Sequence, residues 1–259
     1  MSVLTRVLTS FFYVGILLGS LYLNPIFFGI VICTMATITI YEAQQMAHQH
    51  IPITYLFFPL IFLVSNYNKL GNLLILILGV LGVVLSVYYF VNNKRTKMNS
   101  TFVTLLGFFG IAIPMALLTS LGIKNPELVA FMFGIIWLND SGAYFVGSMI
   151  GKRPLAPYIS PNKTVEGFVG GLLISVVVML FIGNHLALLE SNTIIPIIFV
   201  IALTSSIGDL VQSKIKRQCG VKNSGKILPG HGGMYDRIDS TLLAVPVFSL
   251  LLFLIGYVS

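Results

Sequence analysis

The chain has 259 residues, of which 56% are hydrophobic and only 9% are charged, and its mean hydropathy is +0.95. Soluble domains carry charge on about a quarter of their residues, so this composition excludes an ordinary soluble fold and predicts a membrane protein. The net charge of +7 does not require nucleic acid as a partner, because basic loops orient membrane proteins and contact anionic lipid headgroups.

Nine apolar stretches approach the length of about 20 residues that a helix needs to cross a bilayer. They cover residues 7–23, 25–43, 52–66, 70–92, 101–122, 127–149, 167–188, 193–210 and 240–258. Arg6 before the first stretch is compatible with a secretory signal, but no small-residue cleavage site follows, so we expect an uncleaved span. The sequence predicts an all-α polytopic membrane protein with about nine transmembrane helices.

We expect one membrane domain over residues 1–259, in which residues 1–125 are apolar spans and residues 126–259 carry spans and the reactive loops. With the N-terminus in the cytoplasm, thirteen of the fifteen Lys and Arg residues fall in cytoplasmic loops, and only Lys69 and Lys124 fall outside. The positive-inside rule therefore predicts a cytoplasmic N-terminus. It also predicts a multi-pass protein of the cell (inner or plasma) membrane whose active site faces the cytoplasm.

The first polar segment begins with Asp140, inside the sixth apolar stretch. A carboxylate near the bilayer centre costs about 2.5–3.5 kcal/mol on insertion scales, so it usually faces a cavity or a partner. As a structural alternative, Asp140 is the counter-ion of a nearby Lys or Arg. Gly147 and Gly151, four residues apart, predict that another helix packs closely here.

The loop after this stretch is basic and leads into the next helix. It contains Lys152, Arg153, Ser160 and Lys163. Asn162 or Thr164 can cap that helix, with Glu166 in its first turn. Lys163 lies at the same helix start, where a cation opposes the helix dipole, and a bound phosphate would resolve the conflict.

The second polar segment joins the last two apolar stretches. Asp209, Ser213 and Lys216 recur at i, i+4 and i+7 on one helix face, and Asp236 and Asp239 share another face at i and i+3. The Pro-Gly-His-Gly-Gly turn before them exposes backbone that can approach a phosphate closely. A topology signal or a headgroup patch explains the lysines but not three aspartates among them. Divalent metal ions that bridge carboxylates and phosphates explain both.

Two runs of this sequence resemble the phosphatidate cytidylyltransferase (CDP-diacylglycerol synthase) family. The longer run extends from Ser213 through Lys222-Asn223 and His231-Gly232-Gly233 to Asp236-Arg237-Ile238-Asp239, and the other extends from Asp140 through Ser160-Pro161-Asn162-Lys163-Thr164-Val165-Glu166-Gly167. The resemblance covers about residues 137–240, whereas the earlier spans share only their hydrophobicity with the family. Asn223 departs from the family pattern, which usually has Asp at this position.

The resemblance implies transfer of CMP from CTP to phosphatidate, which yields CDP-diacylglycerol and pyrophosphate. It implies Mg²⁺ or another divalent cation, and it allows a second metal ion and a homodimer. The expected catalytic residues are Asp209, Asp236, Asp239 and Lys216, and the expected metal ligands are Asp209, Asp236, Asp239 and Asp140. The expected substrate-binding residues are Ser213, Arg217, Lys222, His231, Gly232, Gly233, Arg237, Lys152, Ser160 and Lys163. For His231 the alternative is a structural role in ordering the turn.

Two other functions use similar features. A CTP-dependent lipid-alcohol (polyprenol-type) kinase would share the metal and phosphate chemistry but transfer the terminal phosphoryl group. The full His-Gly-Gly-x-x-Asp-Arg-x-Asp run favours the cytidylyltransferase. A transporter would show repeat symmetry or broken helices in both halves, and the sequence shows neither.

Overall fold

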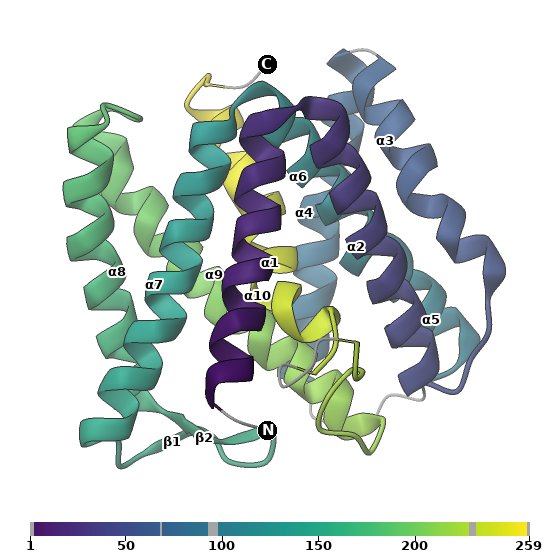
Figure 1. Ribbon diagram of the computed structural model, residues 1–259. Coiled ribbons are helices and arrows are strands. Elements are labelled where there is room, and N and C mark those ends of the chain that lie inside the picture. The colour runs from purple at the N-terminus through teal and green to yellow at the C-terminus, as the bar shows by residue number, and fades with distance from the viewer. Residues whose placement is uncertain (1–2, 68, 93–97, 228–231, 258–259) are drawn as a thin grey trace.

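The computed structural model describes residues 3–67, 69–92, 98–227 and 232–257, with side chains for all of these except 3–8, 65–67 and 191. In these ranges the chain forms a helical bundle, with a small two-stranded sheet at the end where the N-terminus lies (Figure 1). The elements are α1 (Val3–Leu23), α2 (Pro25–Met46), the 3₁₀ helix η1 (Pro52–Leu56), α3 (Phe57–Tyr67), α4 (Lys69–Val91), α5 (Ser100–Leu105), the π-helical turn η2 (Leu106–Ala112), α6 (Ile113–Lys124), α7 (Pro126–Ile150), β1 (Pro154–Ala156), β2 (Ser160–Thr164), α8 (Val165–His185), α9 (Ser191–Gln218) and α10 (Tyr235–Leu254).

Each predicted apolar stretch coincides with a helical stretch of the described chain. Within the described ranges, seven helices are long and apolar enough to cross a membrane, and the apolar helical segments Thr9–Leu23 and Pro52–Val64 are shorter. The chain is therefore a polytopic helical membrane protein. The predicted all-α class is confirmed, and the short antiparallel hairpin of β1 and β2 between α7 and α8 is an addition that the sequence analysis did not predict.

Two helices extend beyond the predicted apolar stretches on the side of the polar loops. Helix α9 continues past the apolar stretch to Gln218, and α10 begins before its apolar stretch at Tyr235, in agreement with the helix faces predicted for the aspartates. Both extensions are rich in polar residues, so hydropathy alone does not assign them to a span. As a result, all the aspartates of the second polar segment lie on helices.

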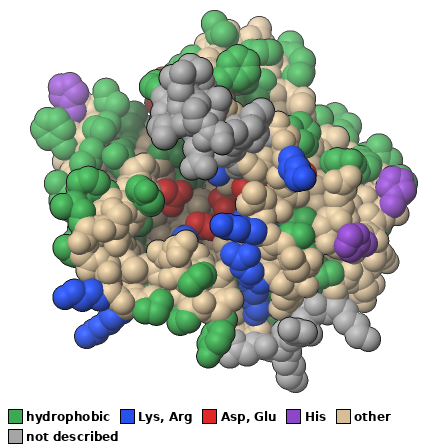
Figure 2. All heavy atoms as spheres, turned by 60° about the horizontal axis from the view of Figure 1, so that its bottom comes forward, with side chains coloured by type: hydrophobic (Ala, Val, Ile, Leu, Met, Phe, Trp, Pro, Cys, Tyr) green, Lys and Arg blue, Asp and Glu red, His purple; other side chains and the backbone are tan. Residues whose placement is uncertain are grey.

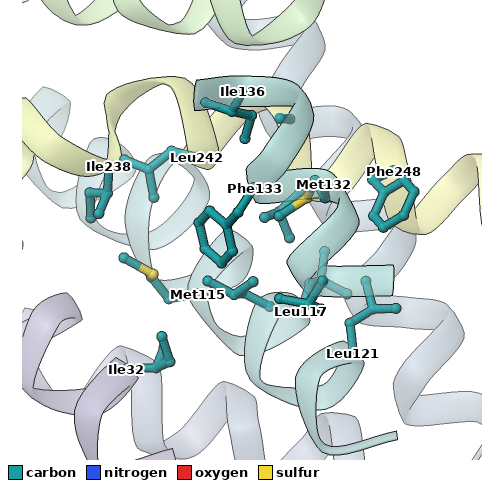
Figure 3. Close-up of a cluster of buried hydrophobic side chains, with 14 of the residues drawn as sticks. Ile32, Met115, Leu117, Leu121, Met132, Phe133, Ile136, Ile238, Leu242 and Phe248 are labelled. Atoms are coloured by element: carbon teal, nitrogen blue, oxygen red, sulfur yellow. The ribbon is translucent and has the colours of Figure 1, made fainter. Parts of the chain in front are cut away.

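The α6 helix forms the centre of the bundle, because every residue from Ile113 to Gly122 is buried. Side chains from α2, α7 and α10 pack around it (Figure 3). The labelled members of this core are Ile32, Met115, Leu117, Leu121, Met132, Phe133, Ile136, Ile238, Leu242 and Phe248. The core thus holds the start of α10, which carries three of the predicted site residues, against the middle of the bundle.

Glycines bring α7 and α8 together. A Cβ atom on Gly167 would lie 2.6 Å from the Ala143 carbonyl oxygen and 3.0 Å from Cα of Gly147, so the backbones leave no room for a side chain. Thr164 caps α8, since its Oγ1 accepts a hydrogen bond from the Gly167 amide (3.1 Å). The predicted close packing at Gly147 and the predicted cap at Thr164 are both confirmed.

Candidate active site

The end of the bundle that carries the N-terminus is hollowed. In Figure 2 acidic side chains lie on the floor of this hollow, with Lys and Arg side chains beside them. Four aspartates of the sequence prediction reach this end from three helices: Asp140 from α7, Asp209 from α9, and Asp236 and Asp239 from the first turns of α10. We refer to this region as the acidic hollow.

Asp209 is paired with a cation from the hairpin. Its Oδ2 forms an ion pair with Nζ of Lys163 on β2, and its Oδ1 accepts a hydrogen bond from Ser213 Oγ (3.2 Å) one turn later on α9. This hydrogen bond confirms that Asp209 and Ser213 share a face of α9. Asp209 also provides the negative charge beside Lys163 that the sequence analysis assigned to a phosphate.

Asp236 is the most heavily bonded carboxylate of the hollow. Its Oδ1 accepts hydrogen bonds from Lys216 Nζ (2.7 Å) and Gln212 Nε2 (3.0 Å) on α9. Its Oδ2 accepts hydrogen bonds from the backbone amides of Ser224 (2.9 Å) and Gly233 (3.0 Å). Asp236 therefore ties α9, α10 and the loop between them together, and the Lys216–Asp236 pair is largely buried.

Asp239 has different surroundings, although it lies only one turn after Asp236. Its Oδ1 accepts a hydrogen bond from the Ser240 amide (2.7 Å), and it belongs to neither ion pair found in the described part of the chain. The charged groups that face it include Asp209, Asp140 and Lys216. Asp239 is thus a carboxylate with two like-charged neighbours, an arrangement that is costly in a low-dielectric setting unless a cation intervenes.

The glycines of the turn before α10 leave room for these carboxylates. Gly232 has φ +85°, and a Cβ atom there would lie 2.6 Å from Asp236 Oδ2. Gly233 is buried against Ser224 and Glu42 and donates its amide to Asp236. The described geometry therefore explains both glycines by close approach to protein carboxylates, in addition to the predicted approach to phosphate.

Glu42 of α2 is a functional candidate that the sequence analysis missed. It is only 1% exposed, and its carboxylate accepts hydrogen bonds from Ser224 Oγ (2.8 Å) and from the amides of Met234 (3.0 Å) and Tyr235 (2.9 Å). A carboxylate at this position complements the positive end of the α10 dipole. Glu42 therefore fixes the start of the helix that carries Asp236 and Asp239.

Helix α1 also reaches the hollow, since Arg237 and Asp239 are the charged neighbours of Tyr13. No sequence pattern distinguishes this phenol from other aromatic residues of the spans.

Glu42, in contrast, could have been found from the sequence, because it is a carboxylate inside an apolar stretch, the same feature that identified Asp140.

The remaining predicted substrate-binding residues lie around the hollow or outside the described residues. Arg217 Nε donates a hydrogen bond to the Ile159 carbonyl (3.2 Å), which holds the end of α9 against the hairpin loop. Lys152 and Arg153 have exposed side chains, and their backbone amides donate to Glu166 (3.0 and 3.1 Å). The other four described residues are Ser160 on β2, Gly232, the exposed Lys222 and the exposed Arg237. His231 lies outside the described residues.

The donor chemistry of the hollow suits a hard divalent cation, which prefers oxygen ligands. Asp239 lines a small cavity together with Gln212, whose buried Oε1 has no hydrogen-bond donor among the described residues. The described residues nonetheless contain no group of three His, Cys, Asp or Glu side chains that could hold one ion. The hollow thus offers the oxygen donors that such a cation prefers, and Asp239, which lies outside both ion pairs, is the carboxylate whose chemistry best suits it.

Comparison with known proteins identifies a family that matches almost the whole chain. The profile of the cytidylyltransferase family matches residues 4–255. A phosphatidate cytidylyltransferase of Staphylococcus saprophyticus is 40% identical over 164 residues, which is 62% of this chain and 62% of the relative. The proteins of the same name from Staphylococcus aureus and Staphylococcus epidermidis are 38% identical over 174 residues and 44% identical over 133 residues.

These alignments cover 66% of this chain and 65% of the S. aureus protein, and 50% of both chains for S. epidermidis. Less than two thirds of each of these three relatives is therefore aligned, whereas the family profile extends through both halves of the bundle. On the strength of that match, the chain belongs to the cytidylyltransferase family.

Proposed function

We propose that the protein transfers CMP from CTP to phosphatidate and so makes CDP-diacylglycerol and pyrophosphate. The observation that carries this proposal is the acidic hollow, where carboxylates and basic side chains meet at one end of a membrane-embedded bundle. Membership in the cytidylyltransferase family and the name of the Staphylococcus relatives support it. The substrates are a charged nucleotide from the aqueous phase and a lipid from the bilayer, and a hollow at the membrane surface is open to both.

The reaction requires positioning and neutralisation of charge more than proton transfer. The phosphatidate monoester has a second pKa near 6, so its oxygen is already a charged nucleophile at pH 7. This oxygen attacks the α-phosphorus of CTP, the α–β anhydride bond breaks, and pyrophosphate leaves with the bonding electrons. Lys216, Arg237 and Lys163 would hold the phosphates in line and offset their charge.

A divalent cation such as Mg²⁺, when bound, would stabilise the charge that develops on the α-phosphate and the leaving pyrophosphate. Asp239 and Asp209 are the residues that would hold it, and Asp140 faces both of them. Asp236 would act differently, because its four hydrogen bonds already fix α9, α10 and the loop. We assign it the role of holding Lys216 in place.

Pyrophosphate release tests the proposed activity. Purified full-length protein, CTP and Mg²⁺ are expected to release pyrophosphate only when phosphatidate is added in detergent micelles. Diacylglycerol, which lacks the attacking phosphate, is the matched control lipid. Release that is equally fast with diacylglycerol, or no release with phosphatidate, would contradict the proposal.

Lys163→Gln tests whether this lysine holds a substrate phosphate. The Lys163–Asp209 pair is partly exposed, with side-chain exposures of 32% and 25%, and such a pair contributes about 0–1 kcal/mol to stability. We therefore expect little change in the melting temperature but a rise of about tenfold or more in KM for phosphatidate, because a charge-assisted contact is lost. An unchanged KM in a folded variant would show that Lys163 only pairs with Asp209 and does not hold a substrate phosphate.

Asn223→Asp tests the one departure from the family motif. Asn223 is exposed and lies beside Gly232 and Asp236 in the described loop. An added carboxylate would meet the excess positive charge of Lys222 and Lys226, and an exposed pair is worth about 0–1 kcal/mol, less than about tenfold in rate. Turnover is expected to change by less than that factor. A gain of about a hundredfold would instead make this position a metal ligand.

Orientation is tested by labelling single cysteines in intact cells. After replacement of Cys33 and Cys219, Lys226→Cys near the hollow is expected to react with an impermeant maleimide only once the membrane is permeabilised. Glu190→Cys, at the opposite end of the bundle between α8 and α9, is the matched control and is expected to react in intact cells. The reverse pattern would place the hollow outside the cytoplasm.

A further inference from the structure

A pocket with a largely apolar wall and a few polar side chains lies at the opposite end of the bundle from the acidic hollow. It is formed where α4, α6 and α10 meet, and it contains Lys69, Lys124 and Ser249. Ser249 lies ten residues after Asp239 on α10, which corresponds to about 15 Å along the helix. Lys69 and Lys124 are also the only two cations that the charge pattern places outside the cytoplasm.

The lining of this pocket is suited to an anion. Two lysines from different helices reach it, and no carboxylate is among the described residues that line it. Ser249 is 9% exposed, and its Oγ has no hydrogen-bond partner among the described residues. A buried hydroxyl without a partner is unfavourable, and an anionic oxygen in the pocket would accept a hydrogen bond from it.

Size and surroundings narrow the choice of anion. The cavity volume is about 60 Å³, which is room for roughly four or five water molecules and therefore for the oxygens of one phosphate. Leu73 and Phe253 line the same pocket and are partly exposed on the outside of the bundle, at 37% and 43%. A phosphate in the pocket would thus have apolar surface next to it, as a lipid with acyl chains requires.

We propose that this pocket binds a phosphate group between Lys69 and Lys124, and that an anionic phospholipid supplies it. The acyl chains lie along the outside of α4 and α10, over Leu73 and Phe253. The site is separate from the acidic hollow and does not depend on the proposed reaction. Its ligand class is a phosphodiester lipid with a net negative charge, from the leaflet opposite to the hollow.

Binding of dioleoylphosphatidylglycerol to the purified full-length protein, counted by native mass spectrometry, tests the proposal. Each lysine near a membrane surface contributes about 1 kcal/mol of attraction to anionic lipid, so Lys69→Gln/Lys124→Gln is expected to bind this lipid about 30-fold more weakly. Lys69→Arg/Lys124→Arg keeps the charges and is expected to retain binding. Lys226→Gln, which removes one exposed cation at the other end, is the matched control and is also expected to retain it.

The remaining arms identify the source of the phosphate. Dioleoylphosphatidylcholine is expected to bind more weakly than phosphatidylglycerol, and millimolar inorganic phosphate is expected not to displace the lipid. Complete displacement by inorganic phosphate would overturn the lipid as the ligand, and equal binding by parent and glutamine variant would overturn the site. Should the glutamine variant fail to fold, Ser249→Ala, which removes one buried oxygen, is expected to weaken binding in the same assay, and unchanged binding would again overturn the site.

Discussion

Asp239→Asn is expected to lower turnover by at least about a hundredfold while the protein stays as stable as the parent or becomes more stable. Asp239 faces two further carboxylates and forms neither ion pair of the described chain. A neutral amide of the same shape removes repulsion from the folded state. It also removes a ligand of the proposed divalent cation, which would stabilise the negative charge that develops in the reaction. Loss of one such stabilising interaction costs about 10²–10³ in rate.

Asp236→Asn is the variant to compare with Asp239→Asn, because the two carboxylates have different partners. Its carboxylate is paired with Lys216 in a largely buried setting, and removing one partner of a buried pair costs about 3–5 kcal/mol. Asp236→Asn is therefore expected to lower both stability and turnover, whereas Asp239→Asn lowers turnover alone. Melting temperature and pyrophosphate release, measured on both variants, separate the two roles. Equal loss of stability in both would refute the assignment, as would near-normal turnover of Asp239→Asn.

Glu42→Gln is expected to lower turnover by about tenfold or more and to lower the melting temperature. The NH₂ group that replaces one carboxylate oxygen cannot accept a hydrogen bond, so at least one of the three donors at the start of α10 loses its partner. An unsatisfied buried donor costs about 1–3 kcal/mol, and more where the lost partner was charged. The start of α10 then moves relative to α9, and the carboxylates of the hollow move with it.

The control for Glu42 is Glu190→Gln, because Glu190 is exposed at the far end of the bundle and makes no side-chain cap on α9. It is expected to match the parent in both assays. If Glu42 acts by positioning, Glu42→Gln also raises the Mg²⁺ concentration needed for half-maximal rate, which a general loss of stability does not. A Glu42→Gln variant with parental turnover would show that the start of α10 holds without this carboxylate.

The spans were predictable from sequence because lipid leaves the backbone few alternatives to a helix. Apolar runs therefore located the helices, and Asn24 and Pro25 mark the start of α2 through a side-chain cap and a proline in the first turn. The polar ends were less predictable. Helices α9 and α10 extend into polar sequence because Asp209–Ser213 and Lys216–Asp236 bond across and along them. Hydropathy contains no information about those bonds, so it could not predict where these helices end.

The partners of the site residues were not predictable, because they lie far apart in the chain. Lys163 reaches Asp209 across 46 residues, and Glu42 reaches Ser224 across 182 residues. Spacing on one helix indicated that Asp236 and Asp239 lie close together, but it could not show that one is fully bonded and the other is not. The charge rule for carboxylates in apolar stretches applied equally to Glu42 and would have found it.

The path of the phosphorus atoms tests the central proposal most directly. With CTP labelled on the α-phosphorus or, separately, on the γ-phosphorus, the account predicts that only the α label enters the lipid fraction. The γ label is expected in pyrophosphate, both transfers require phosphatidate, and both are lost in Asp239→Asn. Transfer of the γ label to lipid would show a kinase and would contradict the proposed cytidylyl transfer.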